Sequence, residues 1–156
     1  MLSQLSKSEL QELCHKTNLF TKNLSKQQII EKINNKMCHN LPNIAFCFLV
    51  YSSVQHEKIW EQFFSQDTMG TANIYSHIKN VNYNTQNWLL SGKSTTVKTK
   101  WCNENLIKAF CKMLKKALKQ SENKYFCLLS GSCIPLQKYN GIYTDITKTT
   151  KSRMNY

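Results

Sequence analysis

The apolar positions of this chain form long continuous runs, separated by segments in which apolar residues recur at helical spacing. Residues 44–51 (IAFCFLVY) and 125–130 (YFCLLS) are continuous runs rich in β-forming residues. Such runs are typical of strands that are buried on both faces of a parallel sheet. Residues 71–78 (TANIYSHI) predict another strand, and residues 97–101 predict a short one.

Helical periodicity fills the intervals between these strands. Residues 54–64 predict an amphipathic helix with its aromatic side chains inward, and residues 103–120 predict a longer helix with lysines on its outer face. A further helix is predicted at 139–146. Strands that alternate with helices predict an α/β fold with a mostly parallel, Rossmann-like sheet and flanking helices. Ligands bind to such sheets beyond the carboxyl ends of the strands, near a switch in strand order.

The amino-terminal segment has a different pattern. Leucines and then isoleucines at helical spacing predict two short helices within residues 2–33, which would form a small helical hairpin. Ser8 stands beside Glu9 and before Glu12, and these residues are expected to cap the first helix. Residues 34–43 are rich in Asn and contain a proline, so they predict a linker to the α/β part.

Composition narrows the class of protein without deciding it. The chain has 156 residues, about one ordinary domain, and a formal net charge of +12. This charge is compatible with binding to nucleic acid, phosphates or anionic surfaces. It is equally compatible with solvated lysines supplied by AT-rich codons, because the lysines are spread along the whole chain. Charge alone therefore leaves both interpretations open.

The cysteines and the apolar runs indicate in which cellular compartment the protein is expected. The seven cysteines contain no CxxC pair, and most lie within apolar runs, where free thiols behave as small hydrophobic side chains. A structural zinc site is therefore disfavoured, and a reducing compartment is expected. The longest apolar run, 44–51, is too short to cross a bilayer, and no secretion signal precedes it. We expect a cytoplasmic protein without a transmembrane segment.

Several motifs of catalysis and binding are missing. The sequence contains neither GxGxxG nor GxxxxGK(S/T), which argues against a dinucleotide-binding fold and a P-loop NTPase. HExxH and GxSxG are missing too, and Ser130-Gly131-Ser132 has the wrong glycine spacing for a nucleophile turn. No DxD-like pair ends a strand, and nine acidic residues in all argue against a carboxylate-rich metal site. No metal ligands are therefore assigned.

Three segments carry a resemblance to a known family. They are IAFCFLVYSSVQHEKIWEQFF at 44–64, NIYSHIK at 73–79, and LLSGSCIPL at 128–136 with the residues up to 143. Together they resemble the core-2/I-branching β-1,6-N-acetylglucosaminyltransferase family. LLSGSCIPL is the most specific of the three, because the strand, the turn and Pro135 follow in the order and at the distances found in the family.

The resemblance implies a GT-A-like fold and the transfer of a sugar from a UDP-sugar to a hydroxyl of a glycan or other acceptor, with inversion at the anomeric carbon. It also implies that no metal takes part. Positive side chains would stabilise the departing diphosphate, and no cofactor is expected beside the UDP-sugar substrate. In the family the carboxylate base and the diphosphate-binding groups lie in the second half of the domain, so no catalytic residue is assigned in this chain.

Candidate site residues lie where the matched strands end. For the donor we predict Tyr51, Ser52, Ser53, His77, Lys79 and Trp101, and for the donor or acceptor at the later turn Ser130, Ser132 and Cys133. Each has a structural alternative, such as an ordinary turn, a core histidine or a tryptophan packed under a helix. Lys79 stands where many members have Asp, Gly131 replaces the Glu of one subfamily, and Cys133 stands at the Asp of another. The Asp contact to the nucleoside is therefore in question.

The resemblances also predict two domains. Residues 43–156 correspond to the N-terminal half of a GT-A-type domain, so the sheet would be incomplete. The chain would then be a truncated or split glycosyltransferase, inactive alone, with a downstream second-half polypeptide as its partner. Residues 1–36 resemble a SAP-type helical module, in which Lys22 and Lys26 would contact DNA phosphates. Three alternatives remain: a hairpin that serves packing, a basic nucleic-acid-binding protein that acts through this module, and a decayed gene product without activity.

Overall fold

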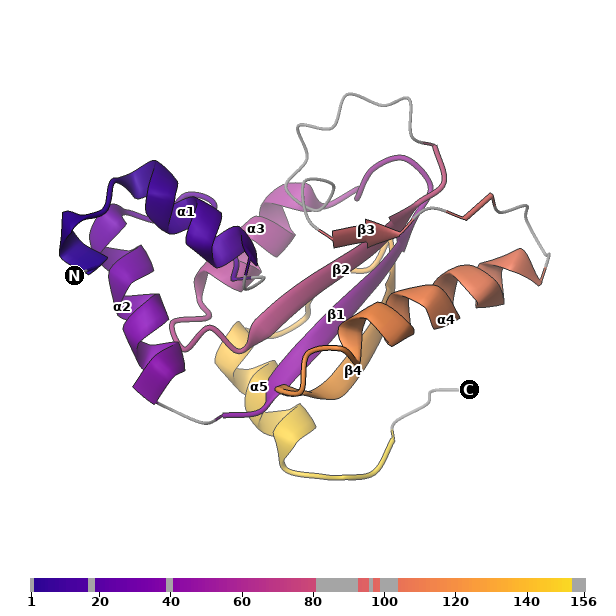
Figure 1. Cartoon of the computed structure of the whole chain (residues 1–156). Helices are drawn as coiled ribbons and strands as arrows, with labels where there is room; N and C mark the ends of the chain where they lie inside the picture. Colours follow the sequence, from indigo (N-terminus) through magenta and orange to yellow (C-terminus); the bar gives the residue numbers. More distant parts are fainter. Residues whose placement is uncertain are drawn as a thin grey trace.

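The computed structural model describes residues 2–16, 19–38, 41–80, 93–95, 97–98 and 104–152. Its elements, in chain order, are the 3-10 helix η1 (Leu2–Gln4), α1 (Lys7–Lys16), α2 (Lys26–Cys38), β1 (Asn43–Val50), α3 (Glu57–Ser65), β2 (Ala72–Ile78), β3 (Lys93–Thr95), α4 (Asn105–Ala117), β4 (Asn123–Ser130) and α5 (Tyr139–Thr147). The strands form one sheet with helices on both sides, and α1 and α2 stand together at one end of the molecule (Figure 1).

The sheet is parallel and has the strand order β3-β2-β1-β4. β1 pairs with β2 on one side and with β4 on the other, so that Phe46 is level with both Ile74 and Cys127. The chain runs outward from β1 to β2 and β3, and then returns through α4 to the far side of β1. The predicted α/β class with a parallel, GT-A-like sheet is therefore confirmed.

β1 lies in the middle of the sheet because its sequence is apolar on both faces. Successive side chains of a strand point to opposite faces. Phe46 and Phe48 pack with α3 and α5 on one face, while Ala45 and Cys47 pack with Met113 of α4 on the other. The expectation that this run is buried on both faces is confirmed.

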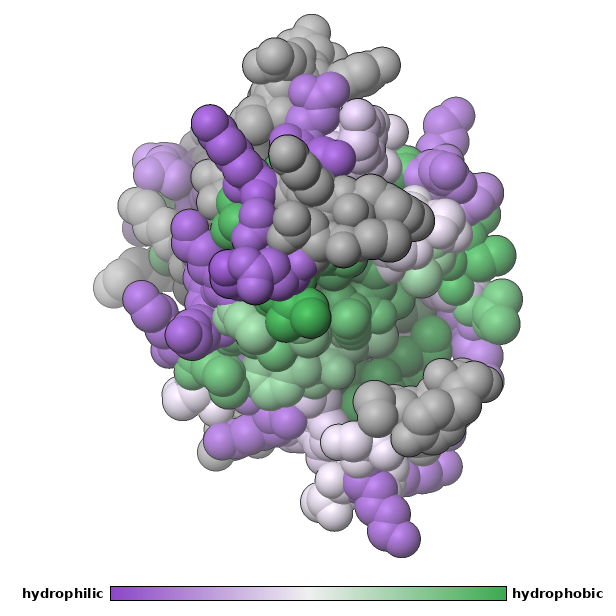
Figure 2. Space-filling model, turned by 90° about the vertical axis from the view of Figure 1, so that its right-hand side faces the viewer, coloured by the Kyte–Doolittle hydropathy of each residue, from purple (hydrophilic) through white to green (hydrophobic). Residues whose placement is uncertain are grey.

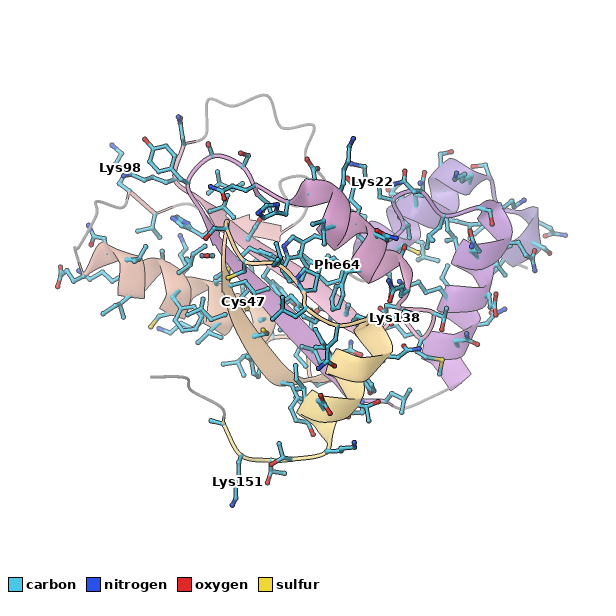
Figure 3. All side chains as sticks on the ribbon, turned by 180° about the vertical axis from the view of Figure 1, so that it is seen from behind. Lys22, Cys47, Phe64, Lys98, Lys138 and Lys151 are labelled. Atoms are coloured by element: carbon cyan, nitrogen blue, oxygen red, sulfur yellow. The ribbon has the colours of Figure 1, made fainter. Side chains whose placement is uncertain are left out.

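Aromatic rings fill the space between the sheet and α3. The Trp60 ring lies edge-on to Phe48 with centroids 5.0 Å apart, and the Phe64 ring lies edge-on to Phe46 at 5.1 Å. Edge-to-face pairs add about 0.5–1.5 kcal/mol each to the free energy gained by burying the rings. Figure 3 shows Phe64 inside the molecule, between the helix and the strands. The predicted helix with inward aromatics is thus confirmed.

The two N-terminal helices begin in the same way. The Ser6 hydroxyl accepts a hydrogen bond from Glu9 N (3.2 Å), and the Glu9 carboxylate accepts one from Ser6 N (2.7 Å). Ser25 and Gln28 form the same reciprocal pair at the start of α2. These pairs are capping boxes, which satisfy N–H groups that lack a partner in the first helical turn. The first helix is therefore capped by Ser6 with Glu9, and not by Ser8.

The helical hairpin packs against the α/β part of the chain. The Phe20 ring, from the connection between α1 and α2, lies 5.8 Å from the Phe64 ring and belongs to the core around α3. Gly70 lies against the same connection. A Cβ atom at Gly70 would lie 2.6 Å from Leu19 Cδ2 and 3.4 Å from Lys36 Cβ, and its φ of +66° also favours glycine.

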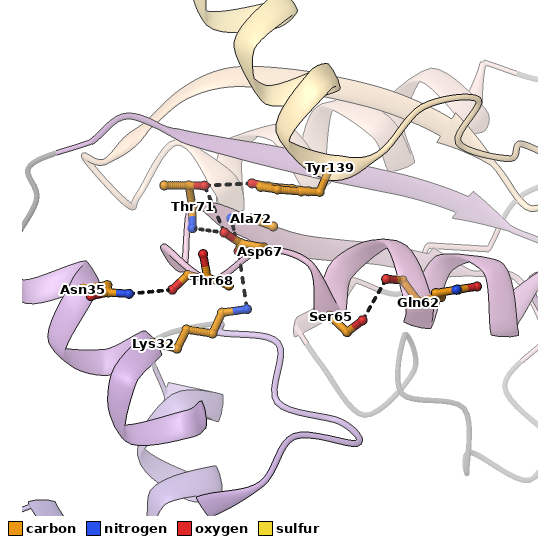
Figure 4. A network of polar contacts seen from close by, with 9 residues as sticks. All are labelled: Lys32, Asn35, Gln62, Ser65, Asp67, Thr68, Thr71, Ala72 and Tyr139. Atoms are coloured by element: carbon orange, nitrogen blue, oxygen red, sulfur yellow. Dashed lines mark hydrogen bonds and ion pairs between the residues drawn. The ribbon is translucent and has the colours of Figure 1, made fainter. Parts of the chain in front are cut away.

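A buried polar network joins α2 to the start of β2 (Figure 4). The Asp67 carboxylate accepts hydrogen bonds from Thr71 N, Thr71 Oγ1 and Ala72 N, at 3.0, 3.1 and 3.0 Å. Lys32 of α2 places its ammonium 3.5 Å from this carboxylate, and the two side chains are 2% and 0% exposed. Because the Thr71 hydroxyl donates to Asp67, the Tyr139 hydroxyl donates to Thr71 Oγ1, at 2.8 Å. The network thus connects α2, β2 and α5.

Two predicted segments differ from the structure. The linker expected at 34–43 is helical as far as Cys38. Asn35 Nδ2 donates to Thr68 O (3.2 Å), and this tertiary contact offsets the low helix propensity of Asn. The short strand expected at 97–101 is wrong for residues 97–98, and the third strand lies instead at Lys93–Thr95, where it pairs with β2. Three polar residues carry no hydrophobic periodicity from which a strand could be predicted.

Thiols in the described part of the chain contribute to packing. Five of the cysteines in the described ranges are free thiols: Cys14, Cys47, Cys111, Cys127 and Cys133. Burial raises the pKa of Cys47 to about 12, and it also raises the pKa of Cys14 and of Cys127. These three thiols are therefore protonated at neutral pH and do not act as nucleophiles. Within the described ranges, no helix has the length and hydrophobicity needed to cross a membrane.

Candidate functional site

A cavity of about 470 Å³ lies where β1, β2 and β4 end. Strand ends, the loops that follow them and one residue of α4 form its lining: Leu49, Val50, Tyr51, Ser53, Gln55, His77, Lys79, Leu106, Ser130, Gly131 and Ser132. Figure 2 views the side toward which the strand ends point and shows apolar side chains gathered across the middle of this face. The cavity thus occupies the place where parallel α/β sheets bind ligands.

Two of the loops that line the cavity contact each other. Gln55 N donates a hydrogen bond to Gly131 O (2.9 Å), which holds the loop after β1 against the loop after β4. A Cβ atom at Gly131 would lie 3.1 Å from Ser53 O and 3.7 Å from Val50 Cγ1, so a glycine suits this close approach. Tyr51 lines the cavity from the loop after β1, and it is 65% exposed to solvent.

β2 contributes a buried histidine and an exposed lysine. His77 is 2% exposed near the end of the strand, while Lys79 lies just beyond it. Lys79 N donates to Val50 O (3.1 Å), so the pairing of β1 with β2 continues past the strand ends. The Lys79 ammonium lies 5.0 Å from the centroid of the Tyr51 ring, which is a cation–π contact.

The turn after β4 is ordered by its own side chains and by α3. The hydroxyls of Ser130 and Ser132 are 3.0 Å apart, and the Cys133 sulfur lies 3.3 Å from Ser130 N and accepts its hydrogen bond. Trp60 Nε1 donates to Cys133 O (2.8 Å), which ties the turn to the aromatic core. Cys133 thus orders the turn, while the two serines line the cavity.

The described lining carries several hydrogen-bonding groups and a positive charge. It offers three serine hydroxyls, the Gln55 amide and the His77 imidazole, and Lys79 is the one formally charged side chain among the described lining residues. The described residues contain no group of three or more His, Cys, Asp or Glu that could hold a metal. An ammonium, several hydroxyls and an exposed aromatic ring together suit a ligand that has a ring and a negative charge.

Comparisons with known proteins identify the family. A sequence profile described as Core-2/I-Branching enzyme matches residues 44–155. The chain belongs to the Core-2/I-Branching enzyme family. It is similar to glycosyltransferase BC10 of Oryza sativa subsp. japonica, at 28% identity over 115 residues, which are 70% of this chain and 29% of the rice protein. No solved structure matches the chain significantly.

The family match contains the whole described cavity. The matched segment begins at Ile44 in β1, so the sheet, α3, α4 and α5 lie within it, while α1 and α2 precede it. The chain spans less than a third of the length of its rice relative, since the match covers 29% of that protein. The cavity of this Core-2/I-Branching chain is therefore built from sequence that the family shares.

Most of the predicted site residues come together at the cavity. Those that line it are Tyr51, Ser53, His77, Lys79, Ser130 and Ser132. Ser52 and Cys133 neighbour lining residues and are not part of the lining. Trp101 lies outside the described residues. The role of each residue in donor binding stays a prediction.

Four lining side chains were not predicted from the sequence: Leu49 and Val50 at the end of β1, and two from outside the sheet, Gln55 and Leu106. Leu106 of α4 is 43% exposed, and its place at the cavity depends on how α4 packs across the sheet. Gln55 lies there because of the hydrogen bond between its N–H and Gly131. The helical pattern of α4 does not indicate that Leu106 reaches the cavity. Gly131 is a signal for the contact with Gln55, because glycine allows the close approach of another loop.

The lysines predicted to contact DNA have partners within the protein. The Lys22 ammonium pairs with Glu61 and lies 3.7 Å from Glu57, both on α3. Lys26 Nζ donates to Ser3 O (2.9 Å). Figure 3 shows Lys22 beside α3. A phosphate would have to replace these contacts. The contacts test neither the SAP-like function nor the predicted domain boundary at residue 36, and both stay predictions.

Proposed function

We propose that this chain forms the donor-binding part of an inverting glycosyltransferase that transfers a sugar from a UDP-sugar to a hydroxyl group. The cavity at the ends of β1, β2 and β4 carries the proposal, because side chains from three separate family segments meet there. The similarity to a rice protein named as a glycosyltransferase supports this class of reaction.

The cavity residues would bind the nucleotide of the donor. The exposed Tyr51 ring offers a surface for the base, and the hydroxyls of Ser53, Ser130 and Ser132 can bind the ribose or the phosphates. During transfer, an acceptor oxygen would attack the anomeric carbon while the bond to the diphosphate breaks, and the acceptor proton would pass to a base. We expect binding without a divalent cation, because no carboxylate lines the described cavity to hold one.

The base would come from family sequence outside this chain, and the open edge of β4 supports such a partner. β4 pairs with β1 alone among the described strands. Its Phe126 and Leu128 side chains are 38% and 51% exposed. Edge strands are usually short, charged or bulged, whereas this strand is apolar from Tyr125 to Leu129. We propose that a second-half polypeptide packs beside β4, where it would also reach the turn at Ser130.

Calorimetric titration with UDP and UDP-sugars tests the proposed function. The titration is made on this chain and on the chain extended by any family sequence downstream. We expect UDP to bind and Ser53→Ala to weaken binding by roughly 2- to 10-fold, the effect of one neutral hydrogen bond. Ser52→Ala is the matched control, because Ser52 adjoins Ser53 without lining the cavity, and it should leave affinity unchanged. If neither protein binds UDP, the proposal is wrong.

DNA binding through residues 1–36 is the alternative function. A gel shift over a range of salt concentrations would detect it, because neutralised phosphates make binding strongly salt-dependent. The double variant Lys22→Ala, Lys26→Ala should then weaken binding. The contacts of these lysines with Glu61 and Ser3 favour a packing role instead, and unchanged DNA affinity of the double variant would exclude the alternative.

A further inference from the structure

The donor cavity lies at the carboxyl ends of the strands, and a second cavity lies where the strands begin. Its volume is about 340 Å³, within the range of about 300–1,000 Å³ that is usual for small-molecule sites. The end of α2, the starts of β1 and β2, and the connection between α4 and β4 surround it (Figure 1). Its described lining consists entirely of polar or charged residues: Lys36, Asn43, Asn73, Lys119, Gln120, Ser121 and Glu122.

Hydrogen bonds within the protein fix the orientation of the Asn73 side-chain amide. Asn123 Nδ2 donates to Ala117 O (2.7 Å), so Asn123 Oδ1 is the atom that accepts from Asn73 Nδ2 (2.6 Å). Asn73 Oδ1 is therefore left as a buried acceptor without a hydrogen-bond partner among the described residues, and Asn73 is 1% exposed. A buried acceptor without a donor is unfavourable, and a ligand that donates to it would remove this cost.

The charged side chains at this cavity leave a positive charge in excess. Among the described lining residues, Lys36 and Lys119 carry positive charges and Glu122 carries the one negative charge. Burial lowers the pKa of Lys36, and the Glu122 carboxylate acts in the opposite direction. The Lys36 ammonium has thus lost part of its hydration, and an anion beside it would favour its charged form. The two lysines would repel a cationic ligand.

We propose that this second cavity binds a small anion that also carries hydroxyl groups, such as a sugar acid or a sugar phosphate. This inference goes beyond the proposed function and does not rest on it. The anionic group would contact the ammonium groups of Lys36 and Lys119, while a hydroxyl group would donate to Asn73 Oδ1. Other hydroxyl groups can donate to the Glu122 carboxylate, which would repel an anion that has no donor.

The helical hairpin contributes to this second cavity. Lys36 belongs to α2, which precedes the segment matched by the family, whereas Asn73 and residues 119–122 lie within that segment. The buried ion pair of Lys32 with Asp67 holds α2 beside the start of β2. The site therefore combines family sequence with the hairpin, and it gives the hairpin a role in binding in addition to packing.

Calorimetric titration of the whole chain with four ligands tests the inference. Glucuronate and glucose 6-phosphate carry a negative charge and hydroxyl groups, glucose lacks the charge, and acetate lacks the hydroxyl groups. We expect at least one of the first two to bind, and glucose and acetate to bind roughly tenfold more weakly. The tighter of the first two ligands identifies the anionic group. If neither binds, or if glucose or acetate binds equally well, the inference is wrong.

A substitution at the rim tests the role of the positive charge. Lys119→Met should weaken the binding of the tighter anionic sugar roughly tenfold, because a charge-assisted hydrogen bond is lost. Lys119 is exposed, so the buried core is unchanged, and a circular dichroism melt confirms folding. Lys115→Met is the matched control, because Lys115 is an exposed lysine one helical turn earlier that does not line the cavity. Equal affinities of Lys119→Met and the wild type would reject the inference.

NMR spectra of the side-chain amides locate the bound ligand. The Asn73 amide signals should shift when the anionic sugar is added and stay unchanged with UDP, because the donor cavity lies at the other end of the strands. UDP should not displace the anionic sugar. Displacement by UDP, or unchanged Asn73 signals at saturating sugar, would overturn the inference. Failure of UDP to bind would instead refute the proposed function and leave this second site standing.

Discussion

Two regions beside the sheet, a closed flank at the start of β2 and an open flank at β4, are covered to different degrees. At the start of β2, the helical hairpin covers α3 with Phe20 and places Lys32 against Asp67 in a buried ion pair. At the open flank, β4 forms one edge of the described sheet, with Phe126 and Leu128 partly exposed. Both flanks carry apolar side chains, and only the first has its cover among the described residues.

The apolar sequence of β4 is typical of a buried strand, although β4 lies at an edge of the described sheet. β1 and β4 have similar apolar runs, yet β1 is buried on both faces while alternate residues of β4 are exposed. A run of this kind is expected in the middle of a sheet. The β4 sequence therefore suits a sheet with a further neighbour, which supports the proposed second-half partner.

The closed flank should be the more sensitive to mutation. Replacement of Lys32 by Met leaves the Asp67 carboxylate buried without its cation, so we expect a loss of about 3–5 kcal/mol in the free energy of unfolding. Urea denaturation measures this loss. Lys22→Met is the control, because the Lys22 side chain is 39% exposed and a partly exposed ion pair contributes about 0–1 kcal/mol. Equal losses for the two variants would contradict the central role of the buried pair.

Loss of the hydrogen bond that links the aromatic core to the turn after β4 should have an intermediate effect on the free energy of unfolding. Trp60→Phe keeps a ring in the core and removes the hydrogen bond from Trp60 Nε1 to Cys133 O. We expect a loss of about 1–3 kcal/mol in unfolding free energy, because the carbonyl loses its donor and the smaller ring leaves a gap. Faster hydrogen exchange in residues 130–135 would show that the turn is released. Unchanged exchange there would mean that the turn is ordered without Trp60.

The open flank should tolerate a polar residue. Leu128→Ser should change the free energy of unfolding by no more than ~0.5 kcal/mol, because Leu128 is half exposed, and it should reduce self-association. Sedimentation velocity measures the association. Leu129→Ser is the matched control on the opposite face, where Leu129 packs against the core, and we expect a loss of about 1–3 kcal/mol. A comparable loss for Leu128→Ser would show that the edge is covered.

The smallest expected effect depends on pH and concerns the cap of α1. The hydrogen bonds from the Ser6 hydroxyl and backbone lower the pKa of Glu9 below its ordinary value of 4.5. A carboxyl whose pKa is lowered on folding stabilises the fold above its unfolded pKa and loses this contribution as the pH falls through the folded pKa. The stability of the wild type should therefore fall toward that of Glu9→Gln below pH 4.5. Thermal melts at successive pH values measure the difference, and a constant difference would contradict the pKa shift.

The sequence predicts elements that have a strong periodicity and misses contacts made between distant segments. β1, β4 and α4 follow from apolar runs or helical spacing, whereas β3 has three polar residues and no such signal. The cavity residues at the strand ends could be predicted because parallel strands end at the same edge. The pairing of Lys32 with Asp67 joins residues far apart in the chain, and no local pattern indicates which acid a lysine contacts.

The most direct test of the donor site is hydrogen exchange of the wild-type protein with and without UDP, followed residue by residue. We predict slower exchange in residues 49–55, 77–79 and 130–133, which form or adjoin the cavity, and unchanged exchange in α1 and α2. Protection confined to the helical hairpin, or unchanged exchange around the cavity at saturating UDP, would contradict the account.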